Sequence, residues 1–222
     1  MPRPTGFAWP YNRAERISDA VVHALGCAFG VCGAAWLLIA VARTGNVQET
    51  ASIAVYALGL VTMLGLSAAY NMWPVSPKKW RLRRFDHAAI YVMIAGTYTA
   101  FVSQMPGDGL SRALLIGVWG AALAGVVIKL LLPGRYDRAA IILYLLIGWS
   151  GTVYYQRVVA SLPGQSLVLL LIGGVLYTIG VIFHAWQGLR FQNTIWHGFV
   201  LAAAVCHYVA ILIFVSQGGV GQ

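Results

Sequence analysis

Seven long apolar segments follow one another along the chain, separated by short breaks rich in proline, glycine and polar residues. Each segment is long enough, at about 1.5 Å per helical residue, to cross the roughly 30 Å of hydrocarbon in a bilayer. Lipid cannot satisfy the backbone of an open strand, so each crossing segment has to be helical. The pattern therefore predicts an all-α bundle of seven transmembrane helices, over residues 18–42, 51–72, 85–104, 111–132, 138–156, 166–187 and 194–217.

The composition supports a membrane protein. Hydrophobic residues make up 59% of the 222 positions and charged residues only 9%, against about 25% charged in soluble domains. All seven segments fit one bundle, so we expect a single domain over 1–222. The first segment is longer than the roughly 7–15 apolar residues of a signal peptide, and we interpret it as an uncleaved span.

The lysines and arginines are distributed unevenly between the two ends of the predicted helices. Twelve of the 15 fall before the first segment or in the second, fourth and sixth loops, whereas Arg43, Arg112 and Arg157 fall at the other end. Basic residues near membrane spans stay on the cytoplasmic side. This predicts a cytoplasmic N-terminus and an external C-terminus, in the inner (plasma) membrane if the source is bacterial.

The net charge of +9 also has to be explained. Nucleic-acid binding is excluded as an interpretation, because no basic arm stands outside the membrane segments. Basic loops of a membrane protein contact anionic lipid instead. Membrane lipids are therefore the partners we expect, and the sequence says nothing about oligomeric state.

Several polar residues stand inside or at the edge of the apolar segments, where they are costly and usually functional. Ser67 and Asn71 are four residues apart and share a helix face, as do Asn193 and His197. Each pair either hydrogen-bonds between helices or lines a pocket. Asp86 starts the third segment, either as a carboxylate stabilised by the helix dipole and nearby arginines or as a pocket group.

The remaining candidates are imidazoles and one carboxylate. His23 follows Asp19 by four residues, which permits a local pair, and Glu15 is placed to cap the first helix or form a salt bridge there. His87 is expected to point about 100° away from its neighbour Asp86. His207 lies near the middle of the bilayer, where it needs a partner.

These residues share one predicted depth. Six of them come from four different segments, yet all map to the cytoplasmic third of the bundle, so one polar cavity is the simplest account. They are His23, Ser67, Asn71, Asp86, Asn193 and His197.

Four motifs give the chain a resemblance to the hemolysin III family, within the superfamily of progestin and adipoQ receptors that includes the adiponectin receptors. The motifs are Glu15-x-x-Ser18-x-x-x-x-His23-x-x-Gly26, Ser67-Ala-Ala-Tyr70-Asn71, Phe85-Asp86-His87-x-x-Ile90-Tyr91-x-x-Ile94-Ala95-Gly96-Thr97-Tyr98-Thr99 and Trp196-His197-x9-His207-Tyr208. The resemblance implies seven helices with the N-terminus inside. It also implies a zinc ion held by three histidines, and an aspartate that holds a zinc-bound water.

The sequence departs from that pattern at two of the three histidines. The implied positions are occupied by Asn71 and Asn193, while His197, Asp86 and Ser67 match. A carboxamide is a poor zinc ligand compared with imidazole, so zinc is expected to bind weakly if at all. We expect Asn71 and Asn193 to hydrogen-bond each other; His23 or His87 could replace the missing ligands only in another geometry.

Three functions follow. The favoured one is a lipid-binding or membrane-homeostasis protein whose zinc site is degenerate. The first alternative, implied by the resemblance, is a zinc-dependent hydrolase of a membrane lipid amide in which Asp86 and Ser67 are catalytic. The second is a pore-forming hemolysin, against which stands the absence of a ring of like charges along the segments.

Overall fold

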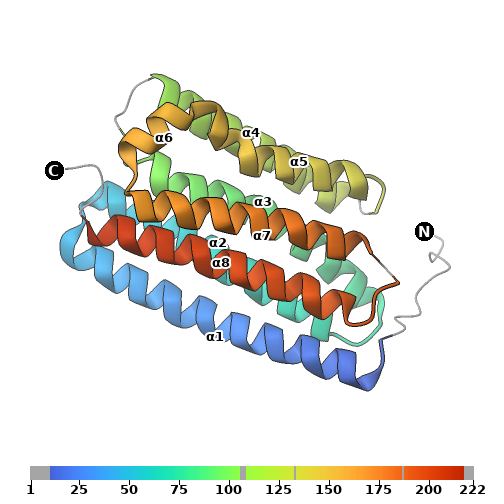
Figure 1. Ribbon diagram of the computed structural model, residues 1–222. Helices are drawn as coiled ribbons and strands as arrows, with labels where there is room; N and C mark the ends of the chain where they lie inside the picture. The colour runs from blue at the N-terminus through green and yellow to red at the C-terminus, as the bar shows by residue number, and fades with distance from the viewer. Residues whose placement is uncertain (1–10, 106–108, 133, 187, 218–222) are drawn as a thin grey trace.

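The chain folds into parallel and antiparallel helices that lie side by side along one direction (Figure 1). The computed structural model describes residues 11–105, 109–132, 134–186 and 188–217, and every regular element within these ranges is helical, as predicted. The elements are α1 (Arg13–Thr44), α2 (Val47–Met72), α3 (Pro77–Val102), α4 (Gly109–Leu131), α5 (Asp137–Trp149), the 3-10 helix η1 (Ser150–Tyr154), α6 (Tyr155–Ser161), α7 (Gly164–Ala185) and α8 (Gln192–Ser216).

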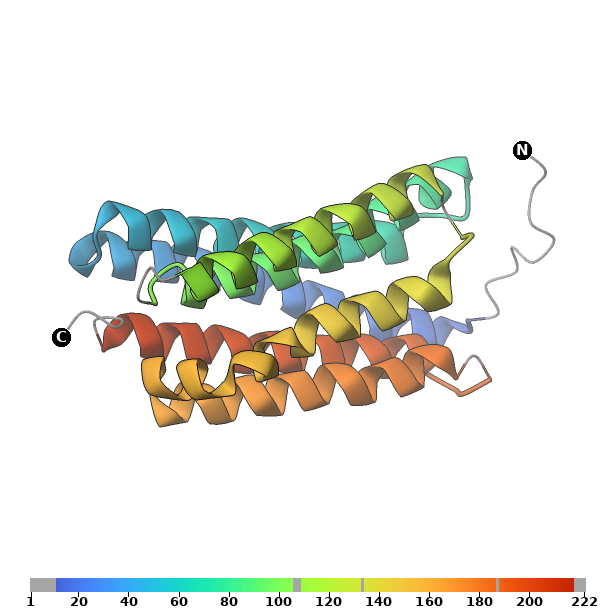
Figure 2. The same ribbon diagram turned by 90° about the horizontal axis from the view of Figure 1, so that it is seen from above.

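The long helices form a ring. α1 packs between α2 and α8, α3 packs between α2 and α4, α7 packs against α8, and α5 contacts α4, α3 and α7. Figure 2 shows α2, α3 and α4 on one side of this ring and α5, α7 and α8 on the other. The first and last helices are therefore neighbours, which brings polar residues nearly 180 positions apart into contact.

One end of the ring carries most of the positive charge. We call it the basic end: α1, α3, α5 and α8 begin there, and α2, α4 and α7 end there. The described basic residues at this end are Arg13, Arg16, Lys78, Lys79, Arg81, Arg83, Arg84, Lys129, Arg135, Arg138 and Arg190.

Within the part of the chain that the structure describes, six stretches are long and apolar enough to cross a membrane: α1, α2, α4, α5 to α6, α7 and α8. Outward-facing side chains on these helices are large and apolar, for example Leu25, Trp36 and Ile116. The chain is thus an integral membrane protein. α3 does not qualify by composition because basic residues crowd its start, although it packs along α2 and α4. The count of seven spans and the orientation remain predictions.

The fifth predicted span, 138–156, lies within a candidate membrane span that runs from Asp137 to Ser161 and is not one continuous α-helix. The helix breaks at Ser150 into a 3-10 turn and resumes as α6, ending at Ser161. The Tyr98 hydroxyl occupies the break: it lies 3.0 Å from the carbonyl oxygens of Ile147 and Gly148 and accepts a bond from the Gly151 N–H at 2.7 Å. Backbone groups freed by the break are thus satisfied from α3, as they must be away from water.

Candidate functional site

The starts of α1 and α8 are fastened together at the basic end. Asn12 and Glu15 form a capping box, in which each side chain accepts a bond from the other's backbone N–H. The second Glu15 oxygen accepts a bond from the Phe191 N–H at 2.9 Å. Phe191 has a left-handed backbone (φ 57°) and immediately precedes α8. Glu15 therefore caps its helix as expected, and it also positions α8 against α1.

One turn further along α1, Asp19 is the centre of a buried polar cluster. Its Oδ1 accepts a bond from His197 Nδ1 at 2.7 Å, and its Oδ2 accepts one from Asn193 Nδ2 at 2.8 Å. His23 Nε2 lies 3.6 Å from the same Oδ2. Asp19, His23 and His197 are only 6%, 6% and 8% exposed. Two imidazoles and an amide thus converge on one carboxylate.

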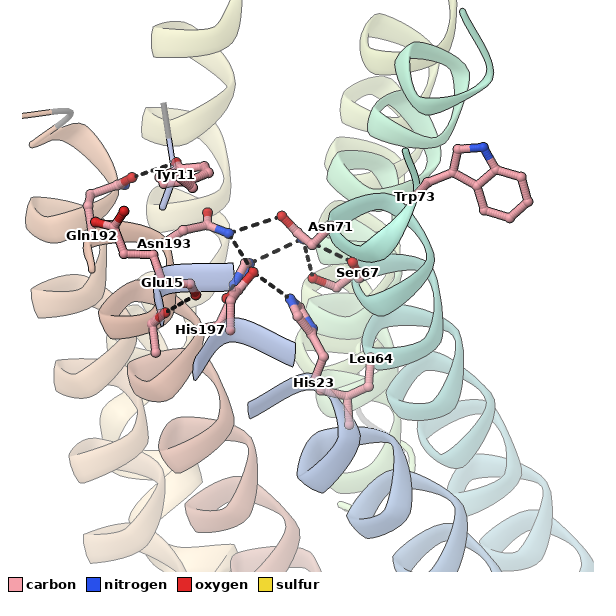
Figure 3. Close-up of polar contacts among 12 residues, drawn as sticks. Tyr11, Glu15, His23, Leu64, Ser67, Asn71, Trp73, Gln192, Asn193 and His197 are labelled. Carbon is pink, nitrogen blue, oxygen red and sulfur yellow. Dashed lines mark hydrogen bonds and ion pairs between the residues drawn. The ribbon is translucent and has the colours of Figure 1, made fainter. Parts of the chain in front are cut away.

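Asn71 on α2 and Asn193 on α8 are joined by a hydrogen bond between the two helices (Figure 3). Asn193 Nδ2 donates to Asn71 Oδ1 at 3.1 Å, which is the bond that the sequence led us to expect. Asn71 Nδ2 in turn donates to the Ser67 carbonyl oxygen at 2.9 Å and lies 3.5 Å from His197 Nε2. The helix α2 is therefore connected through Asn71 to the cluster that α1 and α8 form.

His23 is the least closely held member of the cluster. Its ring lies 4.3 Å from that of His197, centroid to centroid, and both rings point into the space between α1, α2 and α8 (Figure 3). His23 Nε2 is buried and makes no hydrogen bond. Asp19, His23 and His197 each offer a ligand atom, all within 4.8 Å of one another, so this group could hold a metal ion.

Asp86 and Ser67 line the same cavity, with the Ser67 side chain next to the Asp86 carboxylate. Neither belongs to the group of three that could hold a metal. His87 Nε2 lies 3.9 Å from Asp86 Oδ2, so the expectation that these neighbours point apart is wrong. The end groups of successive side chains can approach each other within a helix, which an ideal 100° step ignores. Asp86 also does not start its helix as expected, because α3 begins at Pro77.

His207 takes no part in this cluster. Its Nε2 lies 3.3 Å from the Leu170 carbonyl oxygen, and its ring meets the edge of Tyr177. It fits against α7 because residue 173 is glycine: a Cβ there would overlap the His207 ring. The partner that its depth in the bilayer requires is thus a backbone carbonyl.

A cavity of about 1680 Å³ occupies the inside of the ring. At the basic end it reaches Ser67, Asp86 and His197, and at the other end it reaches Met105 and Leu162. Apolar side chains line most of the length between these two ends. The cavity therefore has a polar part at the basic end that continues into an apolar chamber.

Two hydrogen-bonded contacts lie at the basic end of the cavity. Tyr11 donates to Gln192 Oε1 at 3.2 Å, and both residues line the cavity. Burial, followed by the negative charges of Asp19 and Glu15, raises the pKa of the Tyr11 hydroxyl, so it stays a neutral donor. Lys79 caps the C-terminal end of α2: its Nζ donates to the carbonyl oxygens of Asn71 and Trp73, both at 3.0 Å.

The sequence of this chain is similar to those of known proteins over most of its length. Residues 12–208 match the family described as "Haemolysin-III related". The chain belongs to this family. It is 33% identical over 200 residues to the "Hemolysin-3 homolog" of Bacillus subtilis (strain 168), covering 90% of this chain and 94% of that protein. It is 29% identical over 201 residues to "Hemolysin-3" of Bacillus cereus, covering 90% and 92%.

A human relative connects the chain to the wider superfamily. "Monocyte to macrophage differentiation factor" of Homo sapiens is 30% identical over 166 residues, which cover 71% of this chain and 67% of that protein. The resemblance drawn from the motifs is thus confirmed at the level of the family.

The zinc ligands implied by the hemolysin III pattern do not fit a zinc ion here. Asn71 and Asn193 use their amides to bond each other, and only His197 remains as an imidazole. The residue that sequence reasoning missed is Asp19, which we treated only as a local partner of His23. A carboxylate four residues before a histidine in an apolar segment was the available signal.

Proposed function

We propose that this hemolysin III protein binds a membrane lipid in the central cavity, with the headgroup at the Asp86 and His197 end and the acyl chain in the apolar chamber. We further propose seven spans in the plasma membrane, with the basic end in the cytoplasm. Lysine and arginine crowd that end, and the ring places α3 in line with its neighbours, which supports a seventh span.

The cavity carries this proposal. Its 1680 Å³ exceeds the roughly 300–1,000 Å³ of most small-molecule pockets. Along α3 it runs from Asp86 to Val102, which is about 24 Å at 1.5 Å per residue, close to the depth of a bilayer's hydrocarbon. A long apolar chain ending in a polar group is the ligand shape that matches this lining.

The mouth favours a headgroup that can accept and donate hydrogen bonds. Asp86 and Ser67 supply acceptors and a hydroxyl, and Arg135 and Arg138 line the cavity where it opens at the basic end. A headgroup with an anionic or amide oxygen would find donors there.

Native mass spectrometry of the purified chain in nanodiscs tests this proposal directly. Leu145 lines the cavity, whereas its neighbour Leu146 is 65% exposed on the outside of α5. Leu145→Trp should fill part of the chamber and lower bound lipid at least fivefold, while Leu146→Trp should leave it unchanged. Equal lipid retention in wild type and Leu145→Trp would contradict the proposal.

Hydrolysis of a lipid amide is a second candidate, supported by Asp86 lying next to Ser67 at the headgroup end of the same cavity. A carboxylate placed there could accept a proton from water beside a bound amide. Release of free fatty acid from a long-chain ceramide, abolished by Asp86→Asn, would support this activity. Lipid binding without release in the same assay would leave only the binding function.

A further inference from the structure

We propose a divalent metal site of the zinc class at Asp19, His23 and His197, displaced from the hemolysin III positions toward α1. The site shares His197 with the headgroup end of the cavity, but its ligands hold a metal ion whether or not a lipid is bound. The ligands are one carboxylate from α1, one imidazole from α1 and one imidazole from α8.

The spacing of the donors fits a metal after a small closure. Their ligand atoms lie within 4.8 Å of one another, whereas ligands about 2.0–2.1 Å from a tetrahedral zinc lie roughly 3.3 Å apart. Asp19 and His23 are four residues apart on one helix and already face the same side. Glu15 holds the start of α8 against α1 through the Phe191 N–H, and His197 on α8 therefore lies beside Asp19 and His23.

His23 is held less closely than the other members of the cluster. Its buried Nε2 lies 3.6 Å from Asp19 Oδ2, whereas His197 Nδ1 lies 2.7 Å from Asp19 Oδ1. The contact between His23 and Asp19 is thus longer than a good hydrogen bond. A metal ion bound by Asp19 would take this nitrogen as a further ligand.

The chemistry of the donors favours a transition metal. Two imidazoles and one carboxylate are a common zinc set, and they leave a fourth position open. Magnesium and calcium prefer oxygen ligands and suit the site poorly. The open position borders the cavity that His23 and His197 line, where a water or a headgroup oxygen could bind.

Metal content of the purified full chain tests the site. After removal of metal with a chelator and loading with zinc in nanodiscs, we expect about one zinc per chain by inductively coupled plasma mass spectrometry. His23→Gln and Asp19→Asn should each weaken zinc binding at least tenfold. His207→Gln should retain zinc, because His207 lies outside the cluster and contacts α7. Wild type without zinc, or unchanged binding in His23→Gln, would overturn the proposal.

Cobalt provides a readout that does not depend on loss of binding. His23→Cys replaces the imidazole by a thiolate, which cobalt(II) reports through a sulfur-to-metal charge-transfer band in the near ultraviolet. We expect the band in His23→Cys and not in wild type, whose Cys27, Cys32 and Cys206 lie outside the group of three. A folded, cobalt-loaded His23→Cys protein without the band would show that residue 23 is not a ligand.

Discussion

Asn193 donates a hydrogen bond to Asn71 at 3.1 Å, between the two positions where the hemolysin III pattern implies zinc-binding histidines. Asn193 Nδ2 also donates to Asp19, while Asn71 Nδ2 donates to the Ser67 carbonyl oxygen. Replacing either asparagine would break the bond between α8 and α2. The pair therefore behaves as a unit that joins α2 to α8.

Restoring both histidines should create a tighter zinc site. In the double variant Asn71→His and Asn193→His, two imidazoles would face His197, and we expect the zinc dissociation constant to fall at least tenfold relative to wild type. Competition with a fluorescent zinc chelator measures this. Each single variant should gain less, and an unchanged constant in a folded double variant would show that the backbone no longer presents the implied geometry.

Asp19→Asn should destabilise the fold. The change removes the charge that accepts bonds from His197 and Asn193, in a site that is 6% exposed. Losing a charged acceptor from a buried network costs about 1–3 kcal/mol, so thermal unfolding in detergent should shift several degrees downward. The control is Glu49→Gln at the opposite end of the bundle, which should unfold close to the wild-type temperature.

The apolar pattern predicted most of the fold, because length and hydropathy decide which segments cross a bilayer. It could not predict the break at Ser150, which depends on a hydroxyl supplied by Tyr98 from another helix. In the site, spacing along each helix placed Ser67 with Asn71 and Asn193 with His197. The central role of Asp19 depends on α1 packing beside α8, a contact between the two ends of the chain that no local pattern contains.

Tyr98→Phe should destabilise the bundle more than Tyr91→Phe. The Tyr98 hydroxyl bonds several backbone groups at the break, whereas the Tyr91 hydroxyl donates one bond, to the Ala140 carbonyl oxygen at 2.9 Å. Unpaired backbone groups at the break cost about 1–3 kcal/mol each, and a single lost bond about 1 kcal/mol. Thermal unfolding of the two variants in the same detergent checks the order, and equal shifts would show that water replaces the Tyr98 hydroxyl.

Two valines at opposite ends of the bundle test the proposed orientation. Val47 starts α2 and is 87% exposed, and Val75 lies between α2 and α3 at the basic end and is 55% exposed. In a chain freed of its three cysteines, Val47→Cys should react with a membrane-impermeant maleimide in intact cells. Val75→Cys should react only after the membrane is permeabilised. The reverse pattern would place the basic end outside, and labelling of both in intact cells would show that α2 does not cross the membrane.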